Sequence, residues 1–331
     1  MTKPYTKKPL SISEQAQYLI DKDLICQNRE RLERYLESIG YYRLSVYWKP
    51  FVDVRTNKFK PNTDFEGILK IYVFDRKLRL AILEAIERIE VSLRANWSGT
   101  LALAHGSKSY TEENLFNSVF RRDTKTGKPI ATFQSESNKI INSVRKSKDP
   151  SIIHYRANYV PENQPPIWVI VEIMTFGELS LWFANTKKSH QKHIGKKFGL
   201  PSADVAATVF HALNQVRNYC AHHSRLWNRH VTFSLPKIDR LESIFVLHGD
   251  DGKKEVDNRI YNYLVLIEYL LKAISPSSQW KNRLVNLLET VESSNYRAMG
   301  FPDDWKSREP WCGNNAVTHF ENDSMMNPPI E

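Results

Sequence analysis

Apolar side chains repeat along residues 64–104 with the spacing of a helix, and this repeat constrains the fold more than any other feature. They recur at steps of three and four residues: Ile71, Phe74, Leu78, Ala81, Ile82, Ala85, Ile89 and Leu93. Charged side chains occupy the other face: Arg76, Arg79, Glu84, Glu87, Arg88 and Arg94. Asp64 is a candidate N-cap. The pattern predicts one long amphipathic helix, or two helices in line.

Helical patterns also fill most of the remaining chain. Two short helices are expected within 11–39, the first capped by Ser11 or Ser13 and the second ended by Gly40. Further helices are expected over 167–177, 179–185, 203–223, 257–274 and 279–293. Gly177 would close the first of these, which is a strongly apolar run. The fold class is therefore mainly α.

Changes in composition divide the chain into three parts. Residues 1–63 form an N-terminal helical and aromatic region, and residues 64–305 form a helical core with an inserted segment at 105–165. Residues 306–331 form a polar tail that we expect to be disordered. The aromatic stretch 40–51 contains interleaved basic residues and could stack on nucleic-acid bases. Its large aromatic area favours packing into the core instead.

The chain is basic, which bears on its partners. Lys and Arg number 47 against 37 Asp and Glu, so the formal net charge is +10. A nucleic acid is the expected partner, bound through counterion release, although a basic protein need not bind one. The first residues lack the apolar core of a signal peptide, and no apolar stretch reaches the ~20 residues of a membrane span. We therefore expect a cytoplasmic protein with no membrane partner.

Polar side chains share one face of the helix expected over 203–223. At about 100° per residue they form a stripe, which consists of His211, Asn214, Asn218, His222 and Arg225. The opposite face is apolar: Val209, Ala212, Leu213, Val216 and Cys220. Arg217 lies on the flank, from where its long side chain can reach the stripe. His223 falls on the apolar side, which predicts a structural role as long as the helix continues past Cys220.

The residue types in this stripe suit RNA cleavage without a metal, in which the 2′-hydroxyl attacks the neighbouring phosphorus. The reaction needs a proton-transfer group of near-neutral pKa, which His222 supplies. Arg217 can stabilise the charge on the phosphate oxygens through paired hydrogen bonds. Asn218, one turn before His222, can orient the imidazole or bind phosphate. The same residues also fit a polar seam between helices that has no catalytic role.

Residues 217–228 read RNYCAHHSRLWN, and this string resembles the signature of the AbiD/AbiF group of abortive-infection proteins. That group lies in the HEPN superfamily of helical ribonucleases, whose pattern of Arg, a polar residue and His is matched by Arg217, Asn218 and His222. Further blocks resemble the group in the same order, so that the likeness covers most of the chain. They are GYYRLS at 40–45, FDRKLR at 74–79, IEVSLR at 89–94, PIW at 166–168, FGELS at 176–180 and MGFP at 299–302 with Trp305.

The resemblance implies more than the pattern of residues does. It implies an HEPN-like helical bundle with an N-terminal helical extension and inserted loops. It also implies a homodimer that brings two Arg/His motifs into one cleft, and metal-independent endoribonuclease activity through Arg217, Asn218 and His222. Such an enzyme would be the toxin of an abortive-infection or toxin–antitoxin system that stops growth of a phage-infected bacterium. A small RNA restrains some relatives.

Other polar residues are candidates for the surroundings of this site. Those that could orient the catalytic pair lie on one side of the long helix: Glu87, Glu90 and Arg94. Ordinary ion pairs within the helix explain their spacing equally well. Those expected to contact RNA are Arg225, Arg229, His211 and Asn214. A non-catalytic RNA-binding protein, for instance a component of a small-RNA ribonucleoprotein, is the alternative to an enzyme.

We expect neither a metal nor a cofactor. Cys26, Cys220 and Cys312 lie far apart and lack Cys-x-x-Cys spacing, which argues against a disulfide scaffold or a zinc ribbon and fits a reducing compartment. His190 and His193 are three residues apart and could ligate a metal. No carboxylate or cysteine lies near them in the sequence to complete such a site.

Overall fold

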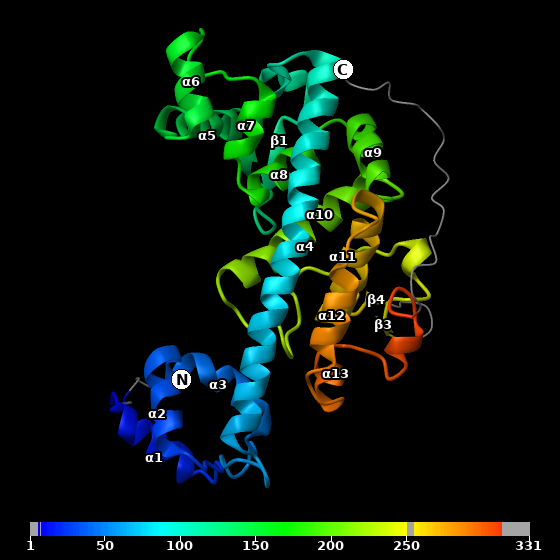
Figure 1. Cartoon of the computed structure of the whole chain (residues 1–331). Coiled ribbons are helices and arrows are strands. Elements are labelled where there is room, and N and C mark those ends of the chain that lie inside the picture. Colours follow the sequence, from blue (N-terminus) through cyan, green and yellow to red (C-terminus); the bar gives the residue numbers. More distant parts are fainter. Residues whose placement is uncertain (1–5, 7, 250–254, 313–331) are drawn as a thin grey trace.

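The computed structural model describes residues 6, 8–249 and 255–312. Over these residues the structure is mainly α, as the sequence predicts, with thirteen α-helices and two small two-stranded sheets. Figure 1 shows one long helix along most of the molecule, with the N-terminal helices at its lower end and the inserted segment at its upper end. Among the described residues, none of the helices combines the length and the hydropathy that a membrane span requires.

The long helix is α4 (Phe65–His105), which runs without a break. The apolar repeat therefore corresponds to one helix, whose 41 residues extend about 60 Å at ~1.5 Å per residue. Asp64 caps it by accepting a hydrogen bond from the amide of Gly67 (2.8 Å). The apolar stripe is buried as predicted, except for Ala81, which is half-buried, but the assignment of Arg79 to the exposed face is wrong. Arg79 is only 5% exposed, because its guanidinium pairs with the buried carboxylate of Asp75.

Three helices form the N-terminal end of the molecule. They are α1 (Ile12–Ile20), α2 (Arg29–Ile39) and α3 (Tyr41–Trp48), followed by a 3₁₀ turn at Lys49–Phe51. Ser11 begins α1 with a capping box, and Gly40 permits the sharp turn after α2 because its φ is 91°. Tyr47 and Trp48 are buried, which confirms that the aromatic stretch belongs to the core. Tyr42 is the exception, with 85% of its surface exposed.

The inserted segment has secondary structure of its own. It comprises 3₁₀ turns at Ser109–Thr111 and Glu113–Leu115, an antiparallel hairpin of β1 (Val119–Arg122) and β2 (Pro129–Thr132), α5 (Phe133–Lys146) and α6 (Pro150–Asn158). An aromatic cluster anchors it, because the ring centroids of Phe116, Phe120 and Phe133 lie 5.0, 5.0 and 5.8 Å from that of Trp182. Such edge-to-face contacts bury large apolar areas. Residues 123–128 form the turn of this anchored hairpin.

The next two helices are α7 (Ile167–Ile173) and α8 (Phe176–Asn185). The predicted helix end at Gly177 is wrong, because α7 stops at Ile173 and Gly177 lies in the first turn of α8. A capping box decides this boundary: Thr175 accepts a hydrogen bond from the amide of Glu178, whose carboxylate accepts one from the amide of Thr175. The basic run that follows forms α9 (Lys188–Lys197).

The helix that carries the polar stripe is α10 (Ala203–Ala221), and it packs against α4, α8 and α9. Ser202 caps its N-terminus by accepting a hydrogen bond from the amide of Val205. Its predicted apolar face is buried throughout: Val209, Ala212, Leu213, Val216 and Cys220. The helix stops at Ala221, short of the predicted end at residue 223, and this early stop reshapes the candidate site.

The C-terminal part packs beside α4 as α11 (Ile260–Ile274), α12 (Trp280–Leu288) and α13 (Ser294–Ala298). A short pair of strands, β3 (Leu247–His248) and β4 (Glu255–Val256), and 3₁₀ turns at Asp239–Leu241 and Trp305–Ser307 complete it. The expectation of disorder from residue 306 onward is wrong for residues 306–312, because Trp311 is buried and packs against Trp305 (6.2 Å between ring centroids). The rest of the predicted tail, 313–331, lies outside the described residues.

Candidate active site

The C-terminus of α10 ends in a tight hydrogen-bonded turn. The amide of His223 donates to the carbonyl of Cys220 (3.0 Å), and the amide of Ser224 donates to that of Tyr219 (2.8 Å). These two bonds define a Schellman motif with His222 as the C-cap. The residue after the cap in this motif adopts the left-handed conformation, and His223 has a φ of 56°.

Because of this turn, His223 and Arg225 lie elsewhere than helical periodicity predicts. His223 was expected on the apolar face, but it is exposed, because the chain reverses its twist at that residue. Arg225 was expected to extend the polar stripe, but it lies beyond the helix and donates a hydrogen bond to the carbonyl of Val46 in α3. His222 is exposed, as its place on the stripe predicted.

Arg217 leans from α10 toward α4. Its Nε lies 3.9 Å from Oε2 of Glu90, and 38% of its side chain is exposed. This separation is long for an ion pair, so Glu90 restrains the guanidinium without saturating it. Within the described part of the chain, the two terminal nitrogens of Arg217 form no hydrogen bond. They are free to donate to an anionic ligand.

Glu90 is itself held by Arg94, which spans two helices. Arg94 pairs with Glu90 one turn away on α4 and donates to the carbonyls of Val171 (2.6 Å) and Met174 (2.8 Å) at the end of α7. Arginine thereby satisfies carbonyls that a helix leaves without partners at its C-terminus. Arg94, Glu90 and Arg217 thus form a series of polar contacts that links α7, α4 and α10. Glu87 is exposed and takes no part in it.

The loop after His222 is pinned against the N-terminal helices. Arg43 of α3 donates to the carbonyl of His223 (3.0 Å). The carboxylate of Asp75 accepts hydrogen bonds from the amides of Leu226 (3.1 Å) and Trp227 (2.7 Å). Together with the Arg225 contact to α3, these bonds fix the backbone from His223 to Trp227.

Sequence reasoning missed Asp75, although it anchors this loop. It is fully buried, pairs with Arg79, and accepts a hydrogen bond from the hydroxyl of Tyr47 (2.6 Å). Burial raises the pKa of the Asp75 carboxyl, and the charge of Arg79 opposes that rise. Burial also raises the pKa of the neighbouring Cys220 thiol to about 12. The signal in the sequence was a carboxylate inside the apolar stripe, beside Phe74.

The other stripe residues lie in different surroundings. His211 is exposed, and its ring lies against that of Phe233 (4.5 Å between centroids). Partial burial of the ring lowers the pKa of His211, and the charge of Arg121 makes a smaller contribution in the same direction. Asn214 is only 8% exposed, with its amide facing Gly177 on α8. Asn218 is half-buried, and its carbonyl accepts the amide of His222 (2.9 Å). Only part of the stripe therefore faces solvent.

The two arginines expected to contact RNA lie close to each other in the loop. Arg229 stacks on the ring of Tyr219 (4.6 Å), and Arg225 lies over that of Trp227 (6.0 Å). Burial lowers the pKa of Arg225, and the charge of Arg229 adds to that effect. Tyr219 also forms a hydrogen bond with Thr232 (2.9 Å). The two guanidiniums give the loop a positive charge next to the histidines.

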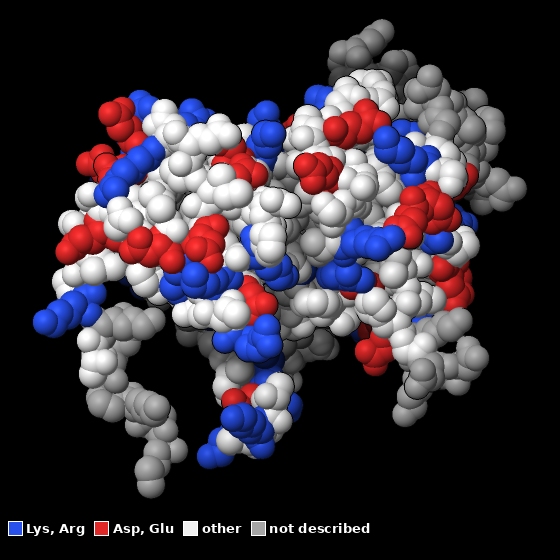
Figure 2. All heavy atoms as spheres, turned by 90° about the horizontal axis from the view of Figure 1, so that it is seen from below, with Lys and Arg blue, Asp and Glu red and all other residues white. Residues whose placement is uncertain are grey.

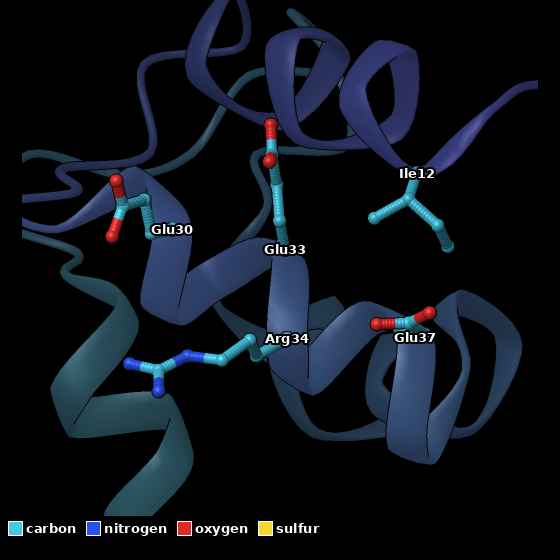
Figure 3. A pocket seen from close by; sticks show the side chains of 5 residues that line it. All are labelled: Ile12, Glu30, Glu33, Arg34 and Glu37. Carbon is cyan, nitrogen blue, oxygen red and sulfur yellow. The ribbon is translucent and has the colours of Figure 1, made fainter.

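Two surface hollows lie elsewhere. One of about 410 Å³ lies between α1 and α2 and is lined by Ile12, Glu30, Glu33, Arg34 and Glu37 (Figure 3). Its three carboxylates against one guanidinium make it unsuited to a phosphate. The other, of about 570 Å³, lies between α4 and α9, where His190 and His193 are found. Within the described residues, no three His, Cys, Asp or Glu side chains are grouped as metal ligands.

The basic residues do not form one continuous patch on the face drawn in Figure 2. This view from below shows Lys and Arg side chains interspersed with Asp and Glu. On this face, therefore, the two signs of charge are mixed.

These features define a mainly helical protein with two exposed histidines at the end of one helix and an arginine five residues before the first. The model of the Abi-like protein family matches residues 34–228. Because this match covers more than half of the 331 residues, the chain belongs to that family. The matched segment contains Asp75, Glu90, Arg217 and His222. Neither a curated protein nor a solved structure matches the chain.

Proposed function

We propose that this protein is a metal-independent endoribonuclease that acts as the toxin of an abortive-infection or toxin–antitoxin system. Membership in the Abi-like family supports the abortive-infection role. One observation carries the enzymatic role: Arg217 presents unsatisfied donors beside Glu90, on the same helix as the exposed His222. The substrate is RNA, a second copy of the chain brings a second motif to the cleft, and a small RNA restrains the toxin.

The chemistry follows from the two side chains. The 2′-hydroxyl of one nucleotide attacks the adjacent phosphorus, which leaves a 2′,3′-cyclic phosphate and a 5′-hydroxyl. Arg217 donates hydrogen bonds to the non-bridging oxygens as their charge grows. His222 transfers a proton. Asn218, one turn earlier, orients the imidazole or contacts the phosphate.

Replacement of the proposed catalytic imidazole tests this function. His222→Ala should lower RNA cleavage by about 10²–10⁴-fold, the usual contribution of a proton-transfer group, and should abolish toxicity. The fold should survive because His222 is exposed. His230→Ala is the matched control, since His230 is another exposed histidine of the loop and bonds to Asn258 (2.7 Å); it should cleave like wild type.

Two readouts decide the outcome. Mapping of cellular RNA ends after expression should find cyclic phosphate and 5′-hydroxyl termini with wild type alone, and purified enzyme should stay active in EDTA. Full cleavage by His222→Ala would refute the assignment. Salt-sensitive binding of RNA that stays intact would instead identify a non-catalytic RNA-binding protein.

A further inference from the structure

We propose that His223 is a second proton-transfer group of the same site. In this assignment His222 accepts the proton of the attacking 2′-hydroxyl, and His223 donates a proton to the leaving 5′-oxygen. The inference rests on the proposed ribonuclease function, and it gives a role to a side chain that helical periodicity assigned to the core.

The first argument is the backbone conformation of His223. The residue after the cap in a Schellman motif is usually glycine, because the left-handed conformation costs a residue with a Cβ about 1–2 kcal/mol. His223 has a φ of 56°. The other non-glycine residues with positive φ in the described part of the chain all have short polar side chains: Asp23, Asn57, Asn62 and Asn228. Strain of this kind is held at functional sites more than elsewhere.

The second argument is what the strained conformation achieves. Had α10 continued, His223 would lie about 140° from Asn218, among buried residues such as Cys220. The left-handed turn exposes its ring instead. Its backbone is fixed at both ends, because its amide donates to the carbonyl of Cys220 and its carbonyl accepts from Arg43. Within the described residues its ring forms no hydrogen bond, so the backbone is clamped while the imidazole is free.

The third argument is the demand of the reaction. The attacking and leaving oxygens lie on opposite sides of the phosphorus, so one group must take a proton while another gives one. His222 and His223 have Cα atoms about 3.8 Å apart, and the change of backbone twist between them directs their side chains differently. As the O2′–P bond forms and the P–O5′ bond breaks, the 2′ proton passes to His222. The 5′-oxygen takes its proton from protonated His223, and exchange with water then restores both rings.

A glycine substitution separates this role from a structural one. His223→Gly supplies the residue that the turn favours, so the melting temperature should hold or rise. RNA cleavage should nevertheless fall about 100-fold or more. Asn228→Gly is the matched control, because Asn228 also has a positive φ (50°) in the same loop; it should gain stability likewise and keep its activity. The pH–rate profile of His223→Gly should lose its alkaline limb, which reports the group that must be protonated.

A modified substrate completes the test. RNA with sulfur in place of the bridging 5′-oxygen has a leaving group that needs no proton, so His223→Gly should cleave it nearly as well as wild type, whereas His222→Ala should not. Wild-type cleavage of ordinary RNA by His223→Gly would overturn the inference, and so would its failure to recover on the sulfur substrate. Recovery of His222→Ala instead would overturn the assignment of roles. Absence of cyclic-phosphate products from wild type itself would mark failure of the proposed function.

Discussion

Two carboxylate–arginine pairs lie on α4 with the same spacing of four residues, and they differ in their surroundings. The side chains of Asp75 and Arg79 are 0% and 6% exposed. Those of Glu90 and Arg94 are 12% and 13% exposed. Asp75 also accepts hydrogen bonds from a tyrosine and two loop amides, whereas Glu90 has Arg217 at 3.9 Å as its further neighbour.

The two pairs share one sequence pattern, a carboxylate followed four residues later by an arginine, but they have different structural roles. A buried carboxylate with all of its acceptors occupied fixes the path of the loop beyond His222, because any movement would leave a charge or an amide without a partner. A half-buried carboxylate that holds an arginine loosely keeps that arginine oriented and leaves its other donors available. Asp75 thus fixes the loop, and Glu90 orients Arg217.

The largest effect on the free energy of unfolding is expected at Asp75, which fixes the loop. Asp75→Asn removes the counter-charge of buried Arg79 and should cost about 3–5 kcal/mol in the free energy of unfolding. Urea denaturation followed by circular dichroism measures it. A smaller loss of unfolding free energy in Asp75→Asn than in Glu90→Gln would contradict the different roles assigned to the two pairs.

Another buried carboxylate, Glu268, lies near lysines in place of an arginine. Burial raises the pKa of Glu268 in α11 to about 7 from 4.5, against the opposing charges of Lys272 and Lys281. Since its pKa is higher in the folded state, stability is full below pH 4.5 and is lost as the pH rises toward 7. Glu268→Gln should therefore stabilise the protein by about 3 kcal/mol at pH 8. It should have little effect near pH 4.5, and an equal effect at both pH values would contradict the burial argument.

The smallest change in stability is expected at the second pair. Glu90→Gln keeps the shape of the side chain, and Arg94 keeps its two carbonyl acceptors. The cost in unfolding free energy should be about 1 kcal/mol. Cleavage should fall about tenfold, because Arg217 loses the charge that orients it. Glu87→Gln is the control one turn earlier, and a loss of activity there as large as in Glu90→Gln would show that general charge rather than position matters.

Much of the fold could be predicted from the sequence, because long helices repeat their apolar contacts locally. The α4 helix and the buried face of α10 followed from spacing alone. The hairpin of the inserted segment could not be predicted in this way, because Phe116, Phe120 and Phe133 acquire their partner, Trp182, from a distant segment. Boundaries set by capping side chains, as at Thr175, were placed wrongly when a glycine was taken as the stop.

The candidate site was predictable in its residues more than in its arrangement. The spacing of Glu90 and Arg94 indicated that they could orient Arg217, and the structure contains contacts between Arg94 and Glu90 and between Glu90 and Arg217. The end of α10 was not predictable, because a histidine and not a glycine occupies the left-handed position. The role of Asp75 depends on amides more than 150 residues away, a distance that no local pattern spans.

The contact of α3 with the loop that follows His222 limits where the chain can be truncated. Residues 1–63 look detachable by composition, yet Arg43 and Val46 hold the loop in which His223 and Arg225 lie. A shortened chain that began at the cap of α4 would retain Arg217 and both histidines but would release their backbone. The first helices therefore help to hold the C-terminal end of α10 and the loop after it in place.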